Sequence, residues 1–112
     1  MTATDTQTVL ASLAQALRDL ATSTSDSSVI NSARHYSREL EIVVPSQGEI
    51  LARGIRDALS NPKSEFTDSL DGSESFRAAR AAAFSVAQAA VNHYIGLRRP
   101  DLATVVSAGR EA

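Results

Sequence analysis

The stretch FRAARAAAFSVAQAAVNHYIGLRR, residues 76–99, contains the densest run of alanine in the sequence and indicates how the chain folds. At about 100° per residue on an α-helix, its apolar residues gather along one line that is small at its centre and aromatic at its ends. That line consists of Phe76, Ala79, Ala83, Ala87, Ala90 and Tyr94. Small residues let helix axes approach to the low end of the usual range of roughly 8–10 Å. The stretch therefore predicts a central helix that packs closely against another.

The opposite side of this helix is polar, which suits water or a partner molecule. We predict that the partner-binding residues are Ser85, Gln88, Asn92, His93, Arg98 and Arg99. The apolar line allows two interpretations. It packs within the chain's own bundle, or it meets a partner's helix, as in a homodimer in which two alanine faces cross.

Two further helices are predicted before residue 45. Leucines three and four residues apart mark an amphipathic helix over residues 5–21, namely Leu10, Leu13, Leu17 and Leu20. The serine- and threonine-rich stretch 22–28 connects it to the next helix, which we expect to be capped near Asp26 or Ser27. The second apolar stripe consists of Val29, Ala33, Tyr36 and Leu40, and we expect a break at Val44, before Pro45.

A third helix is predicted within residues 45–62, with its first turn weakened by Gly48. Its apolar positions at helical spacing are Ile50, Leu51, Ile55, Ala58 and Leu59. Residues 63–71 are expected to form a short helix or an ordered loop in which Phe66 and Leu70 dock together on the bundle. A last short helical segment is expected over residues 101–108. The residues predicted to be buried are Leu13, Leu17, Ile55, Ala87, Val91 and Tyr94.

The predicted fold class is all-α: a compact bundle of four main helices plus one or two short helical segments, in one domain over residues 1–112. No stretch shows the alternation of a half-buried strand. The length of 112 residues suits one domain, and an aromatic content of only 4% favours an aliphatic, alanine-based core.

The absence of cysteine excludes a thiolate nucleophile, a zinc finger and a disulfide framework, and favours a cytoplasmic location. No secretory signal is recognisable at the N-terminus. The most apolar window, residues 81–97, contains Gln88, Asn92 and His93, whereas a membrane span needs about 20 mainly apolar residues. We therefore expect a soluble protein with no membrane contact.

Catalytic signatures are also lacking in the sequence, which has neither a glycine-rich phosphate loop nor a Gly-x-Ser-x-Gly elbow. His35 and Glu39 are four residues apart and could share a metal or a charge pair on one helix face. Zinc usually takes three or four protein ligands, so this pair does not predict a site. We expect no metal, no cofactor and no enzyme activity.

The charge of the chain is unevenly distributed around a net value of −2. Residues 1–75 hold six basic against eleven acidic residues, and residues 76–112 hold five basic against two acidic residues. The acidic side chains that recur every three residues over residues 65–74 would repel phosphate, which argues against nucleic-acid binding. We predict a small protein-interaction or regulatory module, such as a bacterial or phage accessory protein, adaptor or inhibitor, that binds a protein partner through a helix face. The alternative is a nucleic-acid-associated protein that uses Arg98, Arg99 and nearby arginines.

Overall fold

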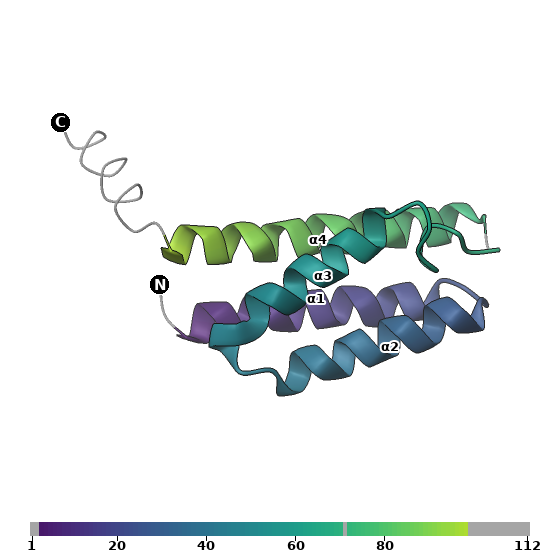
Figure 1. Cartoon of the computed structure of the whole chain (residues 1–112). Helices are drawn as coiled ribbons and strands as arrows, with labels where there is room; N and C mark the ends of the chain where they lie inside the picture. The colour runs from purple at the N-terminus through teal and green to yellow at the C-terminus, as the bar shows by residue number, and fades with distance from the viewer. Residues whose placement is uncertain (1–2, 71, 99–112) are drawn as a thin grey trace.

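The structure, a computed structural model, describes residues 3–70 and 72–98, and helices account for most of them (Figure 1). The elements are α1 (Ala3–Thr22), α2 (Ser27–Ile42), the 3-10 helix η1 (Pro45–Gln47), α3 (Gly48–Ser60) and α4 (Glu74–Arg98). These residues contain no strand. The prediction of an all-α bundle with four main helices is confirmed.

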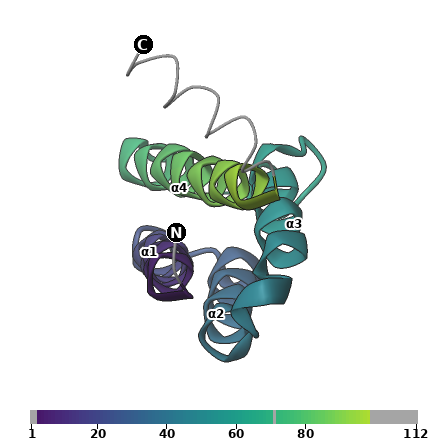
Figure 2. The same ribbon diagram turned by 90° about the vertical axis from the view of Figure 1, so that its left-hand side faces the viewer.

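The helices alternate in direction, with α1 and α3 running one way and α2 and α4 the other (Figure 1). Helix α1 packs against both α2 and α4, and α3 packs mainly against α4. The contact between α2 and α3 is much smaller, because α3 leaves its connection to α2 obliquely to reach α4. Viewed end-on, the four helices surround one core, and the side between α2 and α3 is the less closely packed (Figure 2).

The core is built from leucines of α1, small residues of α4 and a few branched or aromatic side chains. All six residues predicted to be buried are confirmed, each with 5% of its surface exposed or less: Leu13, Leu17, Ile55, Ala87, Val91 and Tyr94. The leucine stripe of α1 is buried along its whole length. Within the described residues, no helix combines the length and the hydropathy of a membrane span.

The alanine face of α4 is covered within a single chain. Ala83, Ala87 and Ala90 have no exposed surface, whereas Ala81 and Ala89 face outward. Because α4 contacts both α1 and α3, its small side chains leave room for two neighbouring helices at once. This packing supports the interpretation in which the apolar line of α4 packs within the chain's own bundle.

Gly48 is placed at a close contact between three elements. A Cβ atom at this position would lie 2.9 Å from Leu10 Cδ2 and closer still to Tyr94 Oη. The Tyr94 hydroxyl donates a hydrogen bond to the Pro45 carbonyl, which fixes η1 against α4. Burial, and then the negative charge of Glu49, raises the pKa of Tyr94, so the donating neutral form is favoured. The glycine that weakens the helix in isolation is therefore required by tertiary packing.

The segment that connects α3 to α4 was predicted to be either a short helix or an ordered loop. Residues 61–70 form turns and bends, so this segment is an ordered loop rather than a short helix. Phe66 is fully buried as predicted, but Leu70 is 98% exposed. The two side chains share no face because the helical geometry that would align them is absent. The predicted segment over residues 101–108 lies outside the described residues.

Ile50, one of the apolar positions at helical spacing, points into solvent with 80% of its surface exposed. The buried positions of α3 are Gly48, Ala52, Ile55 and Leu59. Since α3 packs mainly against α4, it buries one narrow stripe, and Ile50 lies outside that stripe. The preceding break is close to its predicted position: α2 ends at Ile42, and Val43 and Val44 are extended.

Asp26 connects the start of α2 to the loop before α4, and it is the predicted N-cap of α2. Its Oδ1 accepts a hydrogen bond from the Ser28 backbone N–H at 3.0 Å. Its Oδ2 accepts from the Ser69 hydroxyl at 3.0 Å and from the Leu70 backbone N–H at 3.1 Å. The bond from Ser69, and then that from Leu70, holds the pKa of Asp26 below its ordinary value of 3.8. One carboxylate thus caps a helix and anchors a distant loop.

The Asp26→Asn variant is expected to unfold at a lower urea concentration near neutral pH. Asparagine keeps one oxygen for the cap, but its amide nitrogen cannot accept the bonds from Ser69 and Leu70. A lowered pKa in the folded state stabilises the protein above pH 3.8, and this contribution is lost as the pH falls through the folded value. The difference in urea midpoint between wild type and variant should therefore become smaller in titrations at progressively lower pH. A difference that is constant across this range would contradict the role of the charged carboxylate.

Candidate interaction surfaces

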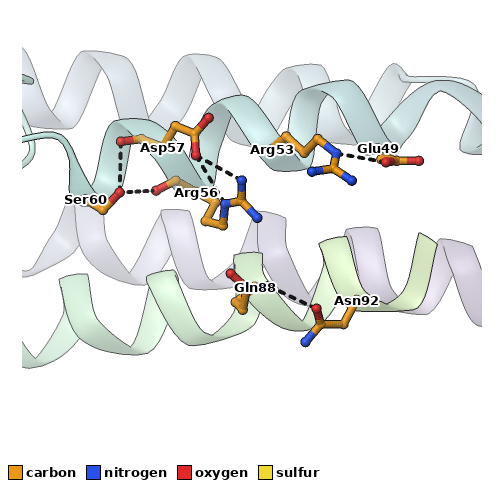
Figure 3. Close-up of polar contacts among 7 residues, drawn as sticks. All are labelled: Glu49, Arg53, Arg56, Asp57, Ser60, Gln88 and Asn92. Carbon is orange, nitrogen blue, oxygen red and sulfur yellow. Dashed lines mark hydrogen bonds and ion pairs between the residues drawn. The ribbon is translucent and has the colours of Figure 1, made fainter. Parts of the chain in front are cut away.

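The outer face of α4 carries three of the residues predicted to bind a partner. Ser85 and Asn92 are exposed, and Gln88 is half-buried. The Gln88 side-chain amide donates a hydrogen bond to Asn92 Oδ1 at 3.0 Å (Figure 3). The three residues therefore lie on one accessible side of the helix, as the helical spacing predicted, although nothing in the structure tests their role in binding.

His93 lies apart from these three residues. Its Nε2 atom and the Thr6 hydroxyl are 2.9 Å apart and share a hydrogen bond, so His93 is directed toward α1. Arg98 is the last residue of α4, but its side chain is not among those described, and Arg99 lies outside the described residues. The nucleic-acid alternative, which depends on these two arginines, therefore stays a prediction.

Helix α3 contributes charged residues that the sequence analysis did not single out. Arg53 Nε donates to Glu49 at 2.8 Å, and Arg56 donates to Asp57 at 3.1–3.2 Å (Figure 3). The Glu49–Arg53 spacing of four residues was a readable signal for the first pair. Both arginines therefore have a carboxylate partner on their own helix.

The stretch between α2 and α3 exposes large apolar side chains, and we call Ile42, Val44 and Ile50 the α2–α3 corner. Their exposed fractions are 80%, 59% and 80%. They lie at the last residue of α2, in the connection and in the first turn of α3, so this short stretch is a candidate protein-interaction surface. The corner was missed at the sequence level because Ile50 follows the same helical period as the buried residues of its helix, and periodicity alone does not distinguish the two.

An open hollow of about 330 Å³ lies beside this corner, between α1 and α2. Its lining residues are Gln7, Leu10, Ala11, Ala14, Leu40, Glu41, Val43 and Pro45. The volume is at the small end for ligand pockets, and the hollow is open to solvent. It therefore suits side chains from another macromolecule better than an enclosed small molecule.

His35 and Glu39, the pair that could share a metal or a charge pair on one helix face, lie on the surface of α2. No group of three or more His, Cys, Asp or Glu residues in the described ranges could hold a metal ion. His35 Nε2 lies 3.6 Å from Glu39 Oε1, and both side chains are largely exposed. The predicted helical spacing of this pair is therefore observed as a surface contact.

Comparison with known protein families, curated proteins and solved structures found no match to this chain.

Proposed function

We propose that this protein is a protein-interaction module that binds its partner through the α2–α3 corner and the adjoining open hollow between α1 and α2. The observation that carries the proposal is the exposure of Ile42, Val44 and Ile50 beside an open hollow. Fully burying one isoleucine side chain contributes roughly 1.5–3 kcal/mol. Covering the corner would thus contribute part of the free energy of binding, which also has to offset the entropy lost on association.

The position of the corner also supports a role in binding. Helix α3 diverges from α2, so Ile42, Val44 and Ile50 at their connection are not covered by any helix in the described ranges. The backbone there is nevertheless fixed, because Tyr94 bonds to the Pro45 carbonyl and the Val43 N–H donates to the Glu39 carbonyl at 2.9 Å. A preorganised apolar surface loses little conformational entropy when a partner covers it.

The test is capture of partners by immobilised protein, followed by mass spectrometry and a direct measurement of affinity for each captured protein. We expect a partner that binds wild type and loses at least about tenfold in affinity for the Ile42→Ser/Ile50→Ser double variant. Both positions are exposed, so these substitutions should change the free energy of unfolding by only about 0.5 kcal/mol each.

The matched control is Leu70→Ser, which removes another exposed aliphatic side chain at the opposite end of the bundle. This variant should capture the same partner as wild type. If the double variant binds every captured protein as well as wild type does, the α2–α3 corner is not the binding surface.

A further inference from the structure

The outward side of the α1–α2 pair contains a second hollow that continues the first. It has a volume of about 340 Å³ and shares Glu41 with the hollow beside the corner. Its lining residues are Arg18, Ala21, Thr22, Arg34, Ser37, Arg38 and Glu41. The two hollows follow the same side of α1 from Gln7 to Thr22, with the Arg18–Glu41 ion pair between them, and we call them together the α1–α2 groove. At 1.5 Å per residue this distance is about 22 Å, or roughly four helical turns.

The charge in this groove is positive and only partly neutralised. Arg18 is paired with Glu41, with their N and O atoms 2.7 Å apart. Arg34 and Arg38 are exposed, and neither forms an ion pair with any residue in the described ranges. The excess charge on this side is opposite in sign to that of the chain as a whole, which is −2.

Two other acids of these helices have hydrogen-bond or ion-pair partners of their own. Asp19 accepts from the Gln15 amide at 2.9 Å, and Glu39 lies against His35. The arginines of α2 therefore present their guanidinium groups to whatever occupies the groove. A guanidinium binds a carboxylate through two parallel hydrogen bonds, so carboxylates are a natural complement.

Apolar surface accompanies these charges. The groove floor between the helices contains Ala14 and Ala21, whose small side chains permit close approach of another backbone. Ile42 follows Arg38 by four residues on α2, so an exposed isoleucine lies next to an unpaired arginine. A ligand that fits both must carry apolar and acidic side chains side by side.

We propose that the α1–α2 groove binds an acidic amphipathic helix of a partner protein, with acidic side chains on Arg34 and Arg38 and an apolar stripe on the alanine floor and Ile42. This inference rests on the proposed function and names the chemistry of the partner. Helix-in-groove binding uses apolar anchors at i, i+3, i+4 and i+7, which span about two helical turns, and the length of this groove accommodates them.

A phosphate polymer fits the same surface less well. Three arginines line the groove and one of them is already paired, whereas nucleic-acid sites use many phosphate contacts or aromatic stacking platforms. The groove-lining residues include no aromatic side chain. The apolar side chains of the groove floor would also face the charged backbone of the polymer, so they would contribute nothing to its binding.

The test uses a fluorescent synthetic peptide of about 16 residues with leucines at helical spacing and glutamates on both flanks. We expect saturable binding to the full chain, measured by fluorescence anisotropy, that weakens as salt is added. The same peptide with lysine in place of every glutamate should bind at least about tenfold more weakly. If the acidic peptide does not bind saturably, the inference is wrong.

Charge reversal locates the site on the protein. Arg34→Glu should weaken peptide binding at least about tenfold. The substitution removes one cation, and the new carboxylate pairs with Arg38 four residues further along α2. Arg77→Glu is the matched control, since Arg77 is exposed on α4, away from the groove, and should leave binding unchanged. Equal loss in both variants, or none in Arg34→Glu, would overturn the inference.

Two further outcomes separate this inference from the proposed function. A captured native partner that needs Ile42 and Ile50 but binds Arg34→Glu as tightly as wild type would overturn the acidic-helix inference alone. Tighter binding of a duplex oligonucleotide than of the acidic peptide, with the same loss in Arg34→Glu, would assign the groove to nucleic acid instead.

Discussion

Replacing Phe66 by alanine is expected to destabilise the protein by about 3–5 kcal/mol, a large part of the stability of a domain this size. Phe66 has no exposed surface although it belongs to a loop. Its ring lies 6.3 Å from that of Tyr36 on α2, centroid to centroid, and its carbonyl accepts from Arg80 on α4 at 3.3 Å. Removing the ring would leave a cavity between these two helices and release the loop that joins α3 to α4.

Urea denaturation followed by far-UV circular dichroism measures this effect. If Phe66 belongs to the common core, the midpoint falls while the slope of the transition stays constant, because the whole bundle still unfolds as one unit. Leu70→Ala is the matched control in the same loop, since Leu70 is almost fully exposed, and its midpoint should be unchanged. Equal losses in the two variants, or a Phe66→Ala midpoint like that of wild type, would refute the core assignment.

The contrast between Phe66 and Leu70 shows why the sequence predicts helices well and loops poorly. Leu13 and Leu17 of α1 could be placed in the core because helical periodicity fixes which side chains share a face. Residues 61–70 have no repeating geometry, so the spacing of four between Phe66 and Leu70 carries no orientation. In such a segment, individual contacts such as those of Asp26 with Ser69 and Leu70 determine which side chain is buried.

Gly48 and Ile50 show a second limit, which concerns tertiary packing. Propensity treats Gly48 as a weak point, but the packed structure needs it because Leu10 and Tyr94 occupy the space of a side chain. Helical periodicity predicts which side of α3 is apolar, but it does not predict how wide a stripe of that side the other helices bury. That width depends on how far α3 diverges from α2, and this divergence exposes Ile50.

The candidate surfaces were predictable only in part for the same reason. The polar side of α4, with Ser85, Gln88 and Asn92, could be read from one helix alone. The α1–α2 groove requires two helices to be placed side by side before Arg18 and Arg34 can be seen to line the same hollow. No spacing in the sequence connects these two residues.

Replacing Ala87 by leucine tests the packing of the alanine-rich helix that determines the fold. Ala87 has no exposed surface, and α4 contacts α1 on one side and α3 on the other. A branched side chain here has to displace a neighbouring helix or leave its preferred rotamer, and overpacking of this kind typically costs about 1–3 kcal/mol. The loss should appear as a lower melting temperature, by several degrees, in thermal unfolding.

Ala89→Leu provides the matched control, because Ala89 is exposed on the same helix and leucine is a good helix former. This variant should melt within a degree or two of wild type, since Ala89 is exposed in the part of the chain that the structure describes. Because the alanine face is covered within one chain, Ala87→Leu should act without changing the molecular mass in light scattering. The melting temperature of wild type should likewise be independent of protein concentration. A concentration-dependent melting temperature that Ala87→Leu abolishes would instead place this face between two subunits, and the single-chain bundle would then be an incomplete description of the folded state.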